Sequence, residues 1–302
     1  MKISDRVYIS SSCIKGATSY SEAIDFIIST GIKNIEISGN HKYLNNLELE
    51  ALLKKYINNE VNFIFHNYFP TPQKEIVMNI LSRKKEYFDN SIQIIKNAIN
   101  LAKETNTHLY GIHPGYLRDA IVKKGKFNFF GEKSSIDNAI EFYKTKFKKI
   151  YENLEINQKK TLFGLENLFP NFDKSNDSFM CSFEEIDEIL NIPFIKKSNL
   201  GIILDLGHLN ISSNILNFDK KNFLNKIIDL HSDKIYEVHI SENQGEFDTH
   251  DEVMPNSWQL NVLKEFRNTG TSAFPTRFTL ESRNLSSDKI KKNYELILEA
   301  LK

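Results

Sequence analysis

Long hydrophobic runs are missing from this sequence of 302 residues, and so is any excess of cysteine. No stretch approaches the roughly 18 consecutive apolar residues of a membrane span. The first six residues lack the apolar segment of a secretory signal. The two cysteines, Cys13 and Cys181, cannot form a disulfide framework, which is typical of a reducing compartment. These absences predict a cytoplasmic protein without a membrane partner.

An excess of charge of one sign is also missing, because 39 basic side chains balance 39 acidic ones. Proteins that bind nucleic acid through its phosphates usually carry a basic surface. The balance of charge therefore argues against a nucleic-acid partner without excluding one. Linkers rich in Gly, Ser or Pro and repeats of fixed period are missing too. We predict one domain over residues 1–302, and a homo-oligomer is compatible with the sequence.

What the sequence does contain is an alternation of short β-branched or aromatic runs with longer segments of helical periodicity. The expected strands are 7–10, 34–37, 62–66, 109–113, 162–166, 201–205, 235–239 and 278–281. The expected helices are 20–30, 47–57, 89–105, 136–154, 183–190, 220–230, 257–266 and 288–301. Eight such units predict an α/β fold of the (β/α)8 TIM barrel type. A doubly wound open sheet is the alternative, but it favours a Gly-rich turn after the first strand, and segment 11–17 matches that turn poorly.

Histidines and carboxylates gather at, or just after, the carboxyl ends of the expected strands. They are His66, His113, Glu166, Asp205, His208, His239, Asp248, His250 and Glu281. In a barrel these strand ends open onto one face, where the active site is built. Several carboxylates close together repel one another and are costly to bury, so a divalent cation is the simplest compensation. Mixed nitrogen and oxygen ligands suit Zn, Mn or Fe better than Mg or Ca.

Two local motifs support this metal site. Asp205 is expected at a strand tip and His208 on the following turn, where they can serve neighbouring ions. Asp248 and His250 are separated by one residue in a loop that we expect to be extended, so they point the same way and can chelate one ion. Glu36 lies at the end of the second expected strand. From the sequence, a position at the mouth of the barrel and a position on the surface are equally plausible for its side chain.

These motifs resemble those of the xylose-isomerase-like (β/α)8 barrels, a superfamily that includes endonuclease IV. The matching segments are Phe65-His66-Asn-Tyr, Ile112-His113-Pro-Gly-Tyr, Leu165-Glu166-Asn, Asp205-x-x-His208, Val238-His239, Asp248-x-His250 and Leu280-Glu281. The segment His66–Pro70 also resembles sugar-phosphate isomerase/epimerase-like proteins from surface-polysaccharide clusters. The resemblance covers nearly the whole chain and implies the TIM-barrel fold already expected from the alternation of strands and helices.

The resemblance also implies how the ligands divide among two or three divalent ions. Members with a single metal use residues that match Glu166, Asp205, His239 and Glu281. Members of the endonuclease type hold a second ion with residues that match His66, His113 and Glu166. They hold a third ion with residues that match His208, Asp248 and His250. All nine positions are filled in this chain, so the resemblance implies a multinuclear site.

Three chemistries follow from the resemblance. The first, which we favour, is isomerisation or epimerisation of a sugar or sugar phosphate. In it Glu166 and Glu281 act as the acid–base pair, and the substrate is contacted by His208, Asn67 and Tyr68. The second is metal-dependent hydrolysis of a phosphodiester at abasic DNA, as in endonuclease IV. The third is oxidation of a peptide, because segments 205–214 and 248–258 resemble multinuclear non-haem iron-dependent oxidases; many of these oxidases have Asn in place of His208.

Overall fold

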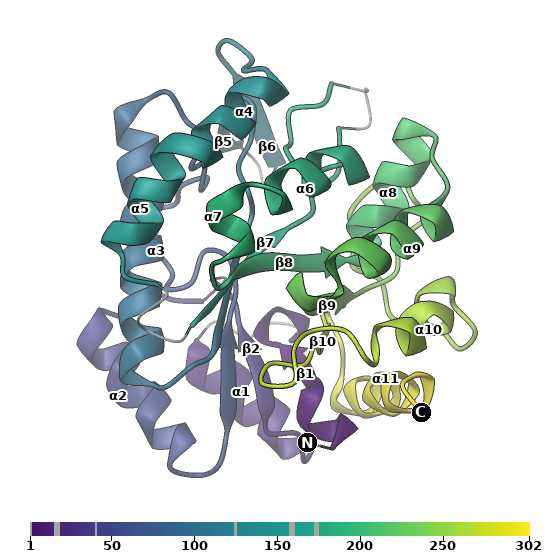
Figure 1. Cartoon of the computed structure of the whole chain (residues 1–302). Helices are drawn as coiled ribbons and strands as arrows, with labels where there is room; N and C mark the ends of the chain where they lie inside the picture. Colours follow the sequence, from purple (N-terminus) through teal and green to yellow (C-terminus); the bar gives the residue numbers. More distant parts are fainter. Residues whose placement is uncertain (1, 15–18, 40, 124–125, 157–160, 172–174) are drawn as a thin grey trace.

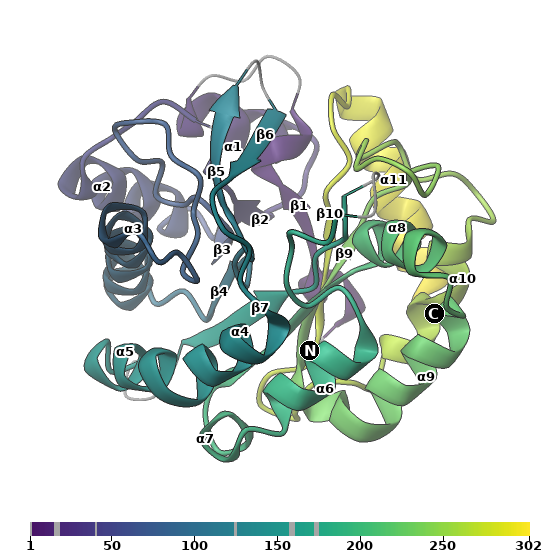
Figure 2. The same cartoon turned by 90° about the horizontal axis from the view of Figure 1, so that it is seen from above.

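The computed structural model describes residues 2–14, 19–39, 41–123, 126–156, 161–171 and 175–302. Eight parallel strands close into a barrel in which β1 pairs with both β2 and β10. The helices are arranged around these strands (Figure 1, Figure 2). The closure of the sheet confirms the predicted (β/α)8 barrel and excludes the doubly wound open sheet.

The barrel strands agree with the expected ones to within one residue at each end. They are β1 (Val7–Ser10), β2 (Asn34–Ile37), β3 (Asn62–Phe65), β4 (Leu109–Ile112), β7 (Leu162–Glu166), β8 (Leu200–Asp205), β9 (Ile235–Ile240) and β10 (Arg277–Leu280). Nearly all of their residues are buried, because helices cover the outside of a parallel barrel and side chains fill its inside.

Eleven α-helices are present in the described part of the chain. They are α1 (Tyr20–Ser29), α2 (Asn46–Ile57), α3 (Lys85–Glu104), α4 (Ile136–Phe142), α5 (Lys148–Asn153), α6 (Phe183–Leu190), α7 (Pro193–Lys196), α8 (Leu206–Leu216), α9 (Lys220–His231), α10 (Trp258–Leu263) and α11 (Ser287–Ala300). A π-helical turn, Tyr143–Phe147, joins α4 to α5. Within the described residues, none of the helices combines the length and the hydropathy needed to cross a membrane.

Helix α8 (Leu206–Leu216) was not expected from the sequence. Its first eight residues are all buried, so it lacks the apolar stripe by which a surface helix is recognised. Asp205 caps this helix, since its Oδ1 accepts a hydrogen bond from the backbone N–H of His208 at 2.6 Å. His208 therefore lies on the first turn of a helix that starts directly at the end of β8.

An antiparallel hairpin was also not expected. It consists of β5 (Asp119–Lys123) and β6 (Lys126–Phe130) and lies between β4 and α4 in the chain. The rings of Phe127 and Phe129 lie against Tyr116, with ring centroids 5.6 and 5.5 Å from the Tyr116 ring. The hairpin thus packs on a residue just beyond the carboxyl end of β4.

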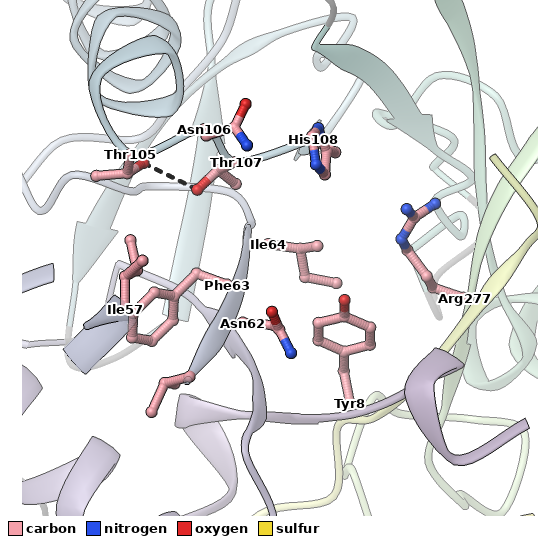
Figure 3. Close-up of a pocket in the computed structure, with 11 residues that line it drawn as sticks. Tyr8, Ile57, Asn62, Phe63, Ile64, Thr105, Asn106, Thr107, His108 and Arg277 are labelled. Atoms are coloured by element: carbon pink, nitrogen blue, oxygen red, sulfur yellow. Dashed lines mark hydrogen bonds between the residues drawn. The ribbon is translucent and has the colours of Figure 1, made fainter. Parts of the chain in front are cut away.

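An apolar cluster and a small cavity lie at the amino end of the barrel. Tyr8, Ile64, Leu109, Leu162 and Tyr236 form a buried cluster there. A cavity of about 190 Å³ at this end is lined by residues that begin strands or lie close to their starts, among them Tyr8, Asn62, His108 and Arg277 (Figure 3). In TIM barrels this end contributes to stability and the opposite end carries the chemistry.

His41 connects the loops that follow β1 and β2, and it gives a pH-dependent contribution to stability. Its Nε2 lies 3.0 Å from the hydroxyl of Ser11, and burial lowers the pKa of His41 from 6.5 to about 4. The unfolded state thus binds a proton more readily than the folded state. The folded state therefore loses stability as the pH falls from about 6.5 to about 4, by up to about 3 kcal/mol.

Replacing His41 is expected to remove this pH dependence. In urea unfolding followed from pH 7 to pH 4, we expect His41→Gln to lose less stability than the wild type over the same range. Equal losses in the two proteins would contradict the assignment of the titrating group to His41.

Candidate metal centre

The nine histidines and carboxylates of the sequence analysis meet at the carboxyl end of the barrel. His66 and His113 directly follow β3 and β4, Glu166 and Asp205 end β7 and β8, and His239 lies in β9. Glu281 directly follows β10, His208 lies in α8, and Asp248 and His250 lie in the loop between β9 and α10. The fold thus brings side chains from widely separated parts of the sequence to one mouth.

Glu166 lies at the centre of this cluster and is buried. Its Oε2 is 3.0 Å from His66 Nε2 and 3.2 Å from His113 Nε2. Its Oε1 is 3.4 Å from His239 Nδ1 and 3.5 Å from His208 Nδ1. The two carboxylate oxygens of Glu166 therefore face two different groups of potential ligands.

Two of these groups have the compactness of an ion site. The first consists of Glu166, Asp205, His239 and Glu281, each with one ligand atom within 4.8 Å of the others. Within this group His239 Nδ1 lies 3.3 Å from Glu281 Oε2 and 3.8 Å from Asp205 Oδ2. The second group consists of His66, His113 and Glu166, within the same limit.

A third group forms around Asp248. Its Oδ2 lies 2.8 Å from His250 Nε2 and 3.6 Å from His208 Nε2. The expectation of an extended loop is wrong, because His250 has a left-handed backbone conformation with φ of 50°. Asp248 and His250 face each other nonetheless, since this turn brings the His250 ring back to the carboxylate.

In three histidines of the cluster, the ring nitrogen Nδ1 has a hydrogen-bond partner that fixes the orientation of the ring. His208 Nδ1 lies 2.8 Å from the backbone carbonyl of Asn167, and His250 Nδ1 lies 3.0 Å from that of Glu281. A carbonyl only accepts hydrogen bonds, so both Nδ1 atoms carry the hydrogen, and Nε2 has a free lone pair in the neutral ring. His113 Nδ1 lies 3.0 Å from the Tyr116 hydroxyl, which the sequence analysis missed. Such second partners are typical of metal-binding histidines.

Ion pairs with histidines of the cluster balance the charges of its carboxylates. Among the described residues, no lysine or arginine forms an ion pair with the carboxylates of Glu166, Asp205, Asp248 or Glu281. Burial raises the pKa of Asp205 to about 6. Burial would also raise the pKa of Glu281, but His239 lowers it to about 2. Burial would lower the pKa of His239, but neighbouring carboxylates raise it well above its ordinary value.

Several buried atoms of the cluster lack hydrogen-bond partners. Glu166 Oε2, Asp205 Oδ2 and His239 Nδ1 form no hydrogen bond with any residue that the structure describes. Leaving buried polar atoms without partners is costly, and each such atom calls for an explanation. A divalent cation with mixed nitrogen and oxygen ligands would satisfy all three, so the residues present fit such an ion.

The residues predicted to contact substrate lie beside the cluster. Asn67 is buried, and its Oδ1 forms no hydrogen bond within the described part of the chain. Tyr68 is half-buried, and its hydroxyl accepts a hydrogen bond from the backbone N–H of Met78 at 3.3 Å. The half-buried Phe169, which the sequence analysis missed, lies over His208 with ring centroids 4.8 Å apart. The substrate contacts of Asn67, Tyr68 and His208 stay a prediction.

The model of the xylose isomerase-like TIM barrel family matches residues 24–295, so this chain belongs to that family. Two uncharacterised proteins of Methanocaldococcus jannaschii are similar in sequence. MJ1614 is 27% identical over 57% of this chain and 55% of its own length. MJ1311 is 25% identical over 88% of this chain and 80% of its own length. The chain thus spans only about half of the length of the first of these relatives.

Solved structures share the fold over nearly the whole chain. A D-tagatose 3-epimerase-like protein has a TM-score of 0.69 and 23% identity, over 98% of this chain and 100% of that one. The IOLI protein with a bound zinc atom has a TM-score of 0.70 and 13% identity, over 98% of both chains. Endonuclease IV from Thermus thermophilus has a TM-score of 0.61 and 14% identity, also over 98% of both chains.

Proposed function

We propose that this protein is a metal-dependent enzyme that isomerises or epimerises a sugar or sugar phosphate. A divalent ion, Zn, Mn or Fe, would be held by Glu166, Asp205, His239 and Glu281. The observation that carries the proposal is the approach of Glu166 and Glu281 to one atom, His239 Nδ1, at 3.4 and 3.3 Å. Their strands, β7 and β10, are separated in the barrel by β8 and β9, so carboxylates from strands that are not neighbours meet beside one potential ligand.

The two glutamates are suited to transfer a proton. The ionised carboxylate of one glutamate removes the proton from the carbon next to the carbonyl. The other glutamate, in its protonated form, returns a proton to the opposite face or to the neighbouring carbon and becomes a carboxylate. Burial would raise both pKa values, but the neighbouring histidines lower that of Glu166 well below its usual range and that of Glu281 to about 2. Either glutamate is therefore ionised at neutral pH and can act as the base, and the other must take up a proton before it can act as the acid. A bound ion would polarise the carbonyl group and hold adjacent sugar oxygens.

The similar proteins support the proposed substrate and cofactor. The D-tagatose 3-epimerase-like protein is named for an activity on a sugar, and the IOLI protein has been observed with zinc. Because these chains share 23% and 13% identity with this one, they support a class of substrate and an ion without identifying either. The reaction itself rests on the two glutamates and the ion position between them.

Solvent exchange tests the proposed reaction without knowledge of the particular sugar. The ion-loaded protein is incubated in D2O with a panel of ketoses and ketose phosphates, and the carbon-bound hydrogens are followed by NMR. We expect deuterium to enter the carbon next to the carbonyl of at least one compound, and only when ions are present. A panel without any ion-dependent exchange would contradict the proposal.

A second candidate function is phosphodiester hydrolysis at abasic DNA. It is favoured by the second carboxylate oxygen of Glu166. This Oε2 lies against His66 and His113, and the three residues together could hold a second ion. Against it stands the balance of 39 basic and 39 acidic side chains. We expect the ion-loaded protein to leave an oligonucleotide with one abasic site intact. Cleavage that disappears with a chelator would make the hydrolase the better assignment.

The native ions separate the three chemistries further. Protein purified without added metal can be examined by elemental analysis and by its optical spectrum. One manganese for each chain would favour isomerisation, three zincs would favour hydrolysis, and iron with an optical band would favour an oxidase that acts on a peptide.

A further inference from the structure

We infer that Glu36 is a positioning residue of the metal centre, because one of its carboxylate oxygens contacts both His66 and His239. These two histidines belong to different ion positions, so Glu36 couples the two positions. The inference rests on the metal site proposed above. It concerns how the ions are held and is independent of which reaction they serve.

Both contacts of Glu36 with the histidines are made by one carboxylate oxygen, Oε2. Glu36 Oε2 lies 3.0 Å from His239 Nε2 and 3.4 Å from His66 Nδ1. The other nitrogen of each ring faces Glu166, with His66 Nε2 at 3.0 Å and His239 Nδ1 at 3.4 Å. The two rings lie side by side, with centroids 4.7 Å apart and planes inclined by 34°. Each imidazole is therefore held between Glu36 on one edge and Glu166 on the other.

Glu36 is a buried carboxylate that forms a compact group of potential ligands with His66 and His239. It lies in β2 with no exposed surface, so the surface position considered from the sequence is wrong. Among the described residues it forms no ion pair with lysine or arginine, and its Oε1 forms no hydrogen bond. A buried carboxylate is costly unless it is paired, and its only ion-pair partners in the described part of the chain are the two imidazoles.

The shared oxygen makes Glu36 different from the other partners of the histidines. His113, His208 and His250 each have a partner of their own, namely a hydroxyl or a backbone carbonyl. A carboxylate that accepts a ring N–H fixes the ring and raises its strength as a ligand. Glu36 Oε2 forms such a hydrogen bond with His239, and it contacts His66 Nδ1 at 3.4 Å without a hydrogen bond. Because one oxygen contacts both rings, the loss of Glu36 should weaken two ion positions together.

Glu237 provides a matched control. It has no exposed surface, and its Oε1 lies 3.5 Å from His239 Nε2. It also accepts a hydrogen bond from Thr279 Oγ1. Glu237→Gln therefore removes the same charge from the same part of the barrel, next to His239 but away from the contact between Glu36 and His66.

Metal affinity tests the inference directly. Zinc binding to the wild type, Glu36→Gln and Glu237→Gln is measured by competition with a chromophoric chelator, and the cobalt-substituted proteins are compared by optical absorption. We expect Glu36→Gln to weaken both the His66 and the His239 position by about 10- to 100-fold and to shift the cobalt bands. We expect Glu237→Gln to weaken binding less, and at one position only.

The possible outcomes separate this inference from the proposed function. Two ions bound by Glu36→Gln with wild-type affinity and an unchanged cobalt spectrum would overturn the coupling role and leave the metal site standing. A wild type that binds no zinc and no cobalt would overturn both. If Glu36→Gln does not fold, Glu36→Asp keeps the charge but is one methylene shorter; weaker binding at both positions supports the inference, and unchanged binding overturns it.

Discussion

Glu281→Gln is expected to lower the rate of ion-dependent deuterium exchange into the sugar by about 10²- to 10⁴-fold, the usual contribution of a positioned acid or base. The amide has nearly the same shape as the carboxylate but cannot take up a proton. The Glu281 side chain lies 3.3 Å from His239 and is mostly buried, so a substitution of similar volume should preserve the barrel. The exchange rate and the ion content are measured on the same preparation.

Glu246→Gln is a suitable control for this experiment. Glu246 is an exposed glutamate in the loop between β9 and α10, so its loss should leave the exchange rate unchanged. If Glu281→Gln kept the wild-type rate with its full content of ions, the role of Glu281 in proton transfer would be contradicted, although its role as a ligand could stand.

Removal of the ions by a chelator is expected to lower the melting temperature by about 10 °C. Ligand present at about 1,000 times its dissociation constant stabilises the folded state by about 4 kcal/mol, and 1 kcal/mol corresponds to about 2–4 °C for a protein of 150–250 residues. Without ions the buried carboxylates are balanced only by protonated histidines, which burial disfavours. Thermal unfolding of dialysed protein, with and without zinc or manganese, measures this effect.

Glu166→Gln should lose most of this stabilisation. The carboxylate of Glu166 faces both compact ligand groups, so its loss weakens two ion positions at once. We expect added ions to shift the melting temperature of the variant by only a few degrees. A wild type whose melting temperature is the same with and without ions would contradict the metal centre.

The barrel could be predicted from the sequence because its strands are short, buried and rich in β-branched residues, and each expected strand is present within one residue. Helix α8 could not, because its first eight residues are buried on every side and show no stripe. The hairpin of β5 and β6 was missed because the sequence around it is rich in lysine, and lysine runs are typical of solvated surfaces. Its packing on Tyr116 depends on tertiary contacts.

The candidate metal centre, like the fold, could be predicted from the sequence only in part. The nine candidate ligands could be named because they stand at strand ends or in the segments that follow them and match the motifs of a superfamily. Their second partners could not, since the contact of Tyr116 with His113 and that of Glu36 with two rings are made only in the folded barrel. One signal was present for Glu36: it is the only charged residue in the strand Asn34–Ile37. A charge in a strand that is otherwise expected to be buried indicates a buried partner.

The central claim is that these side chains hold ions, and anomalous X-ray diffraction at the absorption edge of the bound metal tests it most directly. Crystals of protein purified without added metal should show a peak enclosed by Glu166, Asp205, His239 and Glu281, and any further ion should give its peak between His66 and His113. A map without peaks there, with the histidines still paired to the carboxylates, would contradict the account.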